Sequence, residues 1–364
     1  MSTTEPPTSR VVSTGAAVPP PIVDHTADEA ITAFLAEVGI DHQVDQILAI
    51  MRTAVGLGHD HTDRLDLKIT NAALAEMRAA FGIFAPYHDV PKVTIFGSAR
   101  VQPAEALYAQ TRELAAALAA TGWMVVTGAG PGIMQAGMEG AGVDRSIGVS
   151  IRLPFETEAN EVIANDPKLV SMKYFFTRKL MLVKESLAFV SMPGGFGTLD
   201  ETLELLTLQQ TGKAEPTPIV LLDEPGGTYW SSFARFVTEE LAARRLVAPD
   251  DMERVLVTDS VDAAVAEIRG FWRNYHSLRW VGSRLVLRLR AEPTQDEVAE
   301  LDRRFADLLA TGHIERSGPL GPEVSGDDHV DLPRLVLTLD QYRVGSLHRL
   351  IRAVNELPSA PRPS

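Results

Sequence analysis

The residues best suited to chemistry form one segment near the middle of the chain, residues 193–201, which read PGGFGTLDE. A continuous apolar run at residues 187–192 predicts a strand before this segment, and the apolar spacing of residues 199–210 predicts a helix after it. A glycine loop between a strand and a helix presents several backbone N–H groups at the positive end of the helix dipole. The segment therefore predicts a phosphate-binding loop.

Within this loop, Gly194, Gly195 and Gly197 are expected to bring backbone N–H groups to the phosphate, and the Thr198 hydroxyl is the natural side-chain donor. Glu201 falls in the first turn of the predicted helix, close to whatever the loop holds. A carboxylate beside an anion site is electrostatically unfavourable, so its presence calls for a chemical reason. The glycines alone would also fit a tight turn without a ligand, and the neighbouring Thr198 and Glu201 favour a binding site.

An arginine–lysine pair lies about one helix upstream, where residues 175–185 are otherwise largely apolar. Arg178 carries a planar guanidinium with a fixed fork of donors, which suits a phosphate, a ribose oxygen or a carboxylate. We therefore expect Arg178 to point into the same cleft as Glu201. The sequence leaves Lys179 open between solvent and the site.

Three blocks of the sequence, taken together, resemble one known family. Residues 193–201, with Arg178-Lys179 upstream, are similar to the signature of the LOG ("lonely guy") family, in which PGGxGTxxE follows an Arg-Lys pair. Residues 96–100, FGSAR, resemble the first strand and serine loop of that family, and residues 127–134, TGAGPGIM, resemble its first glycine loop. Three blocks in family order are far more specific than a single glycine motif. The resemblance extends over roughly residues 60–275 and leaves both ends of the chain unexplained.

LOG proteins are cytokinin-activating nucleoside 5′-monophosphate phosphoribohydrolases, often mislabelled lysine decarboxylases. The resemblance implies hydrolysis of the N-glycosidic bond of a nucleoside 5′-monophosphate to a free base and ribose 5-phosphate, without a redox cofactor or a required metal, by a homodimer. It makes Arg178 and Glu201 the expected catalytic pair. The expected substrate-binding residues are Ser98, Gly128, Gly130, Gly132, Met134, Lys179, Gly194, Gly195, Gly197 and Thr198.

The motifs also allow other interpretations. A dehydrogenase is disfavoured because Gly128, Gly130 and Gly132 do not follow the G-x-G-x-x-G spacing, and residues 151–153 read IRL where a ribose-binding acid would stand. A nucleotide-binding sensor without turnover is the non-enzymatic alternative. Residues 173–177, KYFFT, differ from the Met-His-Glu of compact plant-type members and are similar to a longer bacterial branch. The base therefore stays open between a cytokinin and an ordinary nucleobase.

Composition limits the class of protein further. The 364 residues include no cysteine, which excludes disulfides, thiol nucleophiles and thiolate metal sites. A net charge of −14 argues against nonspecific binding to nucleic acid or to anionic membranes. No apolar run approaches the length of a membrane span, and the N-terminus lacks the pattern of a secretory signal. We expect a cytoplasmic protein whose partner is a nucleoside monophosphate.

The elements predict an α/β protein: a Rossmann-like, doubly wound and mostly parallel sheet, with a helical N-terminal extension and a small C-terminal α+β domain. The expected boundaries are a disordered tail at 1–25, the helical extension at 26–88, the nucleotide hydrolase domain at 89–275 and a βαβα domain at 276–364. In that last domain the tetrapeptide RLVL occurs at 284–287 and again at 334–337. Each copy predicts a strand followed by a helix, through either chance or duplication of a half.

Overall fold

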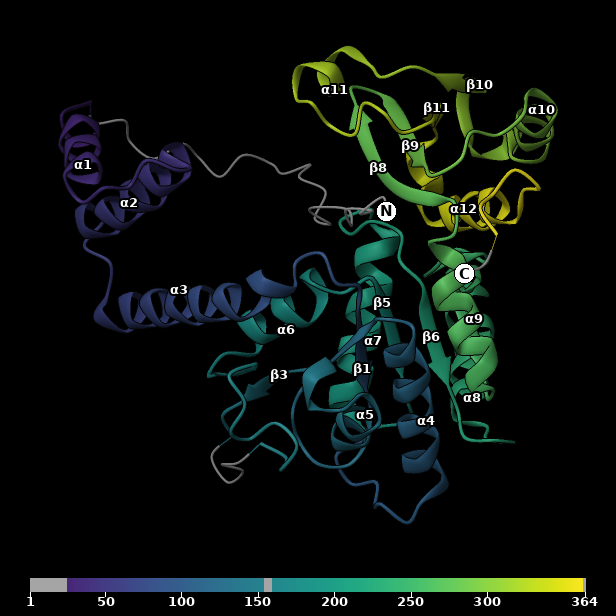
Figure 1. Cartoon of the computed structure of the whole chain (residues 1–364), viewed down its shortest axis with the longest axis horizontal. Helices are drawn as coiled ribbons and strands as arrows, with labels where there is room; N and C mark the ends of the chain where they lie inside the picture. Colours follow the sequence, from purple (N-terminus) through teal and green to yellow (C-terminus); the bar gives the residue numbers. More distant parts are fainter. Residues whose placement is uncertain (1–24, 154–158, 363–364) are drawn as a thin grey trace. The chain divides into compact units, whose positions relative to one another are not determined.

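A computed structural model describes residues 25–153 and 159–362 (Figure 1). The tail predicted for residues 1–25 thus lies outside the described residues except for His25, where the first helix begins. The described chain divides into two compact units at the boundary between Arg78 and Ala79. None of the helices in the described ranges is long and apolar enough to cross a membrane.

The first unit is helical. It contains α1 (His25–Glu37), α2 (Val44–His59) and most of α3 (Arg64–Phe84). The Arg52 guanidinium of α2 contacts both carboxylate oxygens of Asp28 in α1, and Ile31 and Leu35 of α1 are buried. The predicted helical extension is confirmed.

A seven-stranded, wholly parallel sheet forms the centre of the second unit, and its strand order is β4-β3-β2-β1-β5-β6-β7. Its members are β1 (Lys92–Phe96), β2 (Met124–Thr127), β3 (Ser146–Ile151), β4 (Leu169–Met172), β5 (Ala188–Ser191), β6 (Ile219–Leu222) and β7 (Val255–Thr258). Every residue of β1, β2, β5 and β6 is buried, because helices cover both faces of a doubly wound sheet. The predicted Rossmann-like sheet is confirmed.

Two hydrophobic cores hold helices against the two faces of this sheet (Figure 1). On one face lie α4 (Ala106–Ala120), α5 (Ile133–Ala141) and α9 (Val261–Phe271). On the other face lie α6 (Phe175–Lys184), α7 (Phe196–Gln210), α8 (Tyr229–Phe236) and the end of α3. Burial of these apolar faces is the main force that fixes the helices in place.

The order of the strands reverses at β1, which lies between β2 and β5. In an open α/β sheet, ligands bind beyond the carboxyl ends of the strands at such a switch point. The loops that follow β1, β2 and β5 are the three blocks singled out in the sequence, so the fold brings the motifs to one edge of the sheet.

A four-stranded antiparallel sheet follows, with strand order β10-β11-β9-β8. It comprises β8 (Tyr275–Val281), β9 (Arg284–Leu289), β10 (Leu309–Ser317) and β11 (Arg334–Leu339), with helices α10 (Gln295–Arg304), α11 (Gly321–Ser325) and α12 (Leu347–Glu356). The predicted C-terminal α+β domain is confirmed, but its βαβα order was wrong because β8 and β10 were missed. No strand was predicted for residues 275–281, and most of β10 is exposed and lacks a continuous apolar face.

The two RLVL copies occupy the inner strands and pair with each other in antiparallel register, Leu335 opposite Leu287 and Leu337 opposite Leu285. Each inner strand follows an outer strand and precedes a helix, but the second half differs from the first because α11 lies between β10 and β11. The two copies of the tetrapeptide thus form the paired central strands of the sheet.

Specific polar contacts join the second sheet to the first. The Trp272 indole N–H donates to the carbonyl of Leu187 at 3.0 Å, and its ring stacks on Tyr275. His348 of α12 is buried, and its Nε2 donates to the carbonyl of Thr217 at 3.2 Å. Burial lowers the pKa of His348 to about 3, so this imidazole is neutral under ordinary conditions.

Candidate active site

Ser98 holds the three loops of the switch point together. Its N–H donates to the carbonyl of Pro193 in the loop after β5 (3.3 Å), and its carbonyl accepts from the N–H of Ile133 at the start of α5 (3.0 Å). Its hydroxyl oxygen accepts from the N–H of Arg100 at 3.1 Å. The backbone of Ser98 thus fixes the spacing of the loops, which the sequence alone did not predict.

The PGGFGT loop leads directly into α7, which begins at Phe196. The helix starts three residues earlier than predicted, so Glu201 lies in its second turn rather than its first. The Thr198 side chain is buried and packs against Gly194. Space beside Gly195 and Gly197 is open, because a Cβ atom on either would meet no other group. The first turn of α7 therefore borders free space in which an anion would meet its N–H groups.

The first glycine loop, between β2 and α5, has an unusual backbone. Ala129 has a φ of 59°, and its N–H donates to the Thr127 hydroxyl at 3.0 Å. Gly132 has a φ of +66°, and a Cβ atom there would collide with the backbone of Ser98 and Ala99. Only glycine combines this conformation with so close an approach of two loops.

Asn160 supports this glycine loop from a distant part of the chain. Its N–H donates to the carbonyl of Ala129 (2.8 Å), and its side-chain amide donates to the carbonyl of Gly130 (3.0 Å). The Tyr229 hydroxyl, from α8, donates to the carbonyl of Gly194 at 2.7 Å in the other loop. Neither residue belongs to a recognisable motif, so the sequence carried no signal that could have identified them.

Arg178 extends from α6 across the ends of β2 and β3. Its Nε donates to the carbonyl of Val149 at 3.0 Å, and its guanidinium packs so closely on Gly128 that a Cβ there would collide with it. The Met134 side chain packs against Gly128 and Gly130 in the same loop. Burial lowers the pKa of Arg178, and the charge of Glu201 opposes that change. Arg178 thus lies beside the first glycine loop, a contact that the sequence did not predict.

Glu201 is a buried carboxyl, 6% exposed, on the helix that follows the second glycine loop. Within the described residues, its Oε2 atom has no hydrogen-bond partner. Burial raises the pKa of Glu201 from 4.5 to about 7, and the charges of Lys179 and Arg178 limit the rise. A carboxyl whose pKa is raised this far by burial, beside two basic side chains, is a candidate functional group.

Lys179 lies against α7. Its Nζ is 2.7 Å from Glu204, 2.8 Å from Asp200 and 4.0 Å from Glu201, and its side chain is largely buried. The structure thus gives Lys179 a third arrangement that the sequence did not offer, an ion pair with the acids of α7. The described residues contain no group of three or more His, Cys, Asp or Glu side chains that could hold a metal ion.

The fold and the site define a Rossmann-like α/β protein in which two glycine loops meet at the switch point beside a half-buried arginine and a buried glutamate. A family model described as "possible lysine decarboxylase" matches residues 130–268. A cytokinin riboside 5′-monophosphate phosphoribohydrolase of Mycobacterium marinum is 32% identical over 155 residues, which cover 41% of this chain and 79% of the relative. The enzyme of the same name from Mycobacterium tuberculosis is 30% identical over 159 residues, 42% of this chain and 80% of the relative. The chain belongs to the LOG family, as its motifs predicted.

Solved structures with similar folds were also found. A molybdenum cofactor binding protein from Rippkaea orientalis is 19% identical, covers 48% of this chain and 93% of its own, and has a TM-score of 0.34. The molybdenum cofactor carrier protein of Chlamydomonas reinhardtii is 20% identical, covers 49% and 94% of the two chains, and has a TM-score of 0.33.

Proposed function

We propose that this protein hydrolyses the N-glycosidic bond of a nucleoside 5′-monophosphate, either a cytokinin riboside monophosphate or a nucleotide such as AMP. Water adds to the anomeric carbon as the bond to the base breaks, and the products are the free base and ribose 5-phosphate. The names of the relatives from the two mycobacteria support this reaction class. No cofactor is invoked in the proposed mechanism.

The observation that carries the proposal is the buried Glu201 carboxyl, with a pKa raised to about 7, on the helix that begins at the PGGFGT loop. Cleavage of an N-glycosidic bond passes through a ribose with positive charge at the anomeric carbon. The ionised carboxylate of Glu201 would stabilise that charge and would accept a proton from the attacking water, or would attack the carbon directly.

The remaining residues would hold the substrate. The phosphate would bind at the first turn of α7, where Gly194, Gly195, Gly197 and Thr198 offer donors. Binding of the phosphate would hold the ribose near Glu201. The binding energy of the phosphate, which does not itself react, would thus position the anomeric carbon for reaction. Arg178, packed on Gly128 beside Met134, would contact the nucleotide on the side of the first glycine loop.

A homodimer is part of the proposal. Phe175, Phe176 and Leu180 of α6 and Leu203 of α7 are each 38–55% exposed. Exposed apolar side chains on two adjacent helices are typical of a protein interface, and these helices also carry Arg178 and Glu201. Light scattering on the purified protein would report twice the mass of one chain if the proposal holds.

The decisive experiment measures base release by chromatography with AMP and with isopentenyladenosine monophosphate. Preference for the prenylated nucleotide would identify a cytokinin-activating enzyme, whereas comparable release from AMP would identify a nucleosidase of ordinary nucleotides. Tight binding of both nucleotides without release of either base would contradict the enzymatic proposal.

That last outcome would support a nucleotide sensor, and one observation favours keeping this second candidate. The C-terminal sheet contacts the far end of α7 through a short chain of hydrogen bonds. Gln209 of α7 donates to the hydroxyl (2.6 Å) and the carbonyl of Thr217, and the same carbonyl accepts from His348 of α12. The helix that bears Glu201 is thus linked through Thr217 to α12, which lies outside residues 130–268, the range that the family model matches.

A further inference from the structure

One side chain from outside the sequence motifs holds the PGGFGT loop. Tyr229 is the first residue of α8, and its hydroxyl donates to the carbonyl of Gly194 at 2.7 Å. The half-buried tyrosine ring packs against the hydrophobic core that holds α7 on the sheet. Burial, together with the charge of Asp223, raises the pKa of Tyr229. The hydroxyl therefore keeps its proton at neutral pH and remains a donor.

The parallel sheet fixes the position of Tyr229. Asp223 directly follows β6 and is buried, and its carboxylate accepts from the N–H of Trp230 at 3.0 Å and from that of Glu224 at 3.1 Å. The N–H of Asp223 donates to the carbonyl of Thr258, at the end of β7, at 2.8 Å. Because a carboxylate that accepts from the first turn of a helix satisfies one of its free N–H groups, Asp223 sets where α8 begins. Tyr229 is thus presented to the loop from a rigid support.

The contact with Tyr229 sets the direction of one peptide group. The described residues contain no cis peptide bond, so the carbonyl of Gly194 and the N–H of Gly195 point in opposite directions. Since α7 begins at Phe196, Gly195 precedes its first turn, where N–H groups have no partner inside the helix. A Cβ atom on Gly195 would meet no other group, so the loop borders open space there. The tyrosine draws the carbonyl toward α8 and so turns the Gly195 N–H away from α8.

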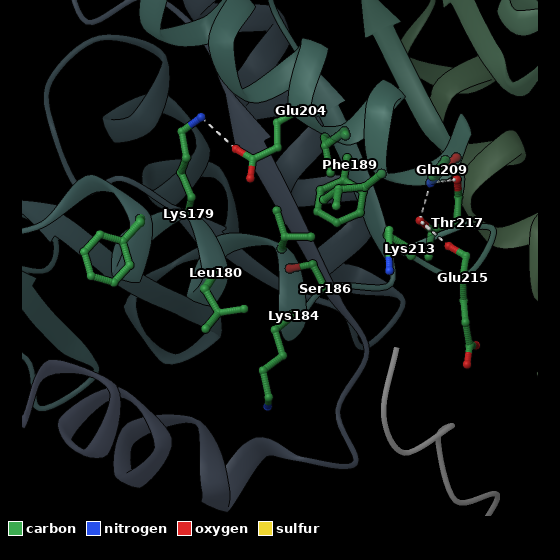
Figure 2. A pocket seen from close by; sticks show the side chains of 15 residues that line it. Lys179, Leu180, Lys184, Ser186, Phe189, Glu204, Gln209, Lys213, Glu215 and Thr217 are labelled. Atoms are coloured by element: carbon green, nitrogen blue, oxygen red, sulfur yellow. Dashed lines mark hydrogen bonds and ion pairs between the residues drawn. The ribbon is translucent and has the colours of Figure 1, made fainter. Parts of the chain in front are cut away.

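The body of α7 is held by contacts that do not involve Tyr229. Figure 2 shows two of them, the Lys179 ammonium directed at Glu204 (2.7 Å) and the Gln209 amide bonded to the Thr217 hydroxyl (2.6 Å). Loss of the tyrosine hydroxyl should therefore leave α7 in place. The part of the structure that depends on this hydroxyl is the peptide group at the start of the helix.

We propose that Tyr229 is a positioning residue that directs the Gly195 N–H at the 5′-phosphate of the substrate. This inference rests on the proposed function, which places the phosphate at the first turn of α7. Tyr229 would not touch the nucleotide and would act through the peptide between Gly194 and Gly195. A donor that is already oriented loses less freedom when the ligand binds than one that must be ordered. The hydroxyl should therefore contribute to the binding of phosphorylated ligands and not to that of the nucleoside.

The test compares Tyr229→Phe with Tyr108→Phe in the full chain, by calorimetric titration with AMP, ribose 5-phosphate and adenosine. Both substitutions keep the ring and remove one hydrogen bond. The Tyr108 hydroxyl donates to Glu139 at 2.8 Å, a contact between α4 and α5 that involves neither glycine loop. Tyr229→Phe should weaken AMP and ribose 5-phosphate by about tenfold each and leave adenosine unchanged. Tyr108→Phe should change the affinity for each ligand by less than about twofold.

Unchanged affinity of Tyr229→Phe for AMP or for ribose 5-phosphate would overturn the proposal, as would an equal loss for AMP and adenosine. The hydroxyl would then have a structural role alone. Absence of AMP binding to the wild type would overturn it too, because no phosphate would be held at α7.

Kinetics separate this inference from the proposed function. With AMP as substrate, kcat/KM should fall about tenfold in Tyr229→Phe and stay within about twofold in Tyr108→Phe. If the wild type hydrolyses AMP and Tyr229→Phe does so equally well, the positioning role fails and the proposed function stands. If the wild type binds AMP and releases no adenine, the proposed function fails, and the titrations of the two variants still decide the role of Tyr229.

Discussion

At the scale of single residues, Glu201 is the group on which the proposed chemistry depends. Its carboxyl is buried next to Arg178 and Lys179, whose charges limit the rise of its pKa but do not cancel it. An ionised carboxylate is needed to stabilise positive charge or to accept a proton. Its protonation state, rather than its presence alone, should therefore govern turnover.

We expect the rate of base release to fall on the acid side with an apparent pKa near 7. Glu201 loses its proton as the pH rises through about 7, so kcat should increase over that range. Measuring kcat from pH 5 to pH 9 with AMP checks this. Lys179→Met should move the acid limb to higher pH because it removes a positive charge beside Glu201, and Lys179→Arg should restore it. An acid limb that stays in place in the methionine variant would contradict the role given to Lys179.

Glu201→Gln should abolish turnover, leave nucleotide binding largely intact, and stabilise the fold at high pH. The pKa of Glu201 is higher in the folded state than in the unfolded chain, so the folded state binds its proton more tightly. The stability of the wild type should therefore fall as the pH rises from about 4.5 to 7, where only the unfolded chain ionises. The glutamine variant lacks this loss, so its Tm should exceed that of the wild type more at pH 8 than at pH 5. Equal differences in Tm at the two pH values would contradict a buried carboxyl of raised pKa.

At the scale of elements, the glycine loops and the helices that follow them would position the substrate. The sequence allowed prediction of α7, of the strand before it and of the loop between them, because glycine spacing and apolar periodicity are local signals. It did not allow prediction of the Ser98, Asn160 and Tyr229 contacts, which join loops far apart in the chain through backbone carbonyls. Such contacts depend on tertiary packing and leave no periodic pattern.

The start of α7 and strand β10 show the same limit. Phe196 is 93% exposed, so the first turn of α7 contributes little apolar periodicity. Most of β10 is exposed as well, and its pairing with β11 depends on backbone hydrogen bonds that any sequence can make. The start of α7 and β10 bury little apolar surface and so leave little periodic signal in the sequence, whereas β8 is largely buried and was missed although its residues lie in the core.

Gly132→Ala should destabilise the first glycine loop and weaken nucleotide binding. A left-handed backbone costs an alanine about 1–2 kcal/mol, and the added Cβ would also collide with the backbone of Ser98. Gly142→Ala is a matched control, because Gly142 has a φ of +79° but open space around it. Urea unfolding and nucleotide titration should show a larger loss for Gly132→Ala. Equal losses in the two variants would mean that loop contact is unimportant.

At the scale of the whole molecule, the chain combines a parallel sheet that carries the glycine-loop motifs with a second sheet that has its own buried charges. Glu323 is fully buried and accepts from Arg288 at 2.8 and 3.0 Å, while Arg334 lies 2.8 Å from its other carboxylate oxygen. Burial alone would raise the pKa of Glu323, but the N–H of Leu320 and the two arginines lower it. The ion pairs therefore fasten the segment that contains α11 to β9 and β11.

Glu323→Gln should destabilise the protein by about 3–5 kcal/mol, because it leaves the buried Arg334 without its carboxylate and leaves Arg288 with Asp328 alone. Glu300→Gln removes an exposed ion pair with Arg303 and should change the free energy of unfolding by less than about 0.5 kcal/mol. Urea unfolding followed by circular dichroism compares the two variants. A loss in Glu323→Gln as small as in the control would show that the buried network does not contribute to stability.

The indole of Trp272, which bonds to Leu187 across the two sheets and stacks on Tyr275, gives the protein a built-in optical reporter. The chain has only four tryptophans, and Trp123 and Trp230 lie in the cores of the first sheet while Trp280 packs on the second. Replacing those three with phenylalanine would leave one fluorophore at the junction. Its emission would shift to longer wavelength on separation of the sheets, so ligands could be screened for that motion by fluorescence alone.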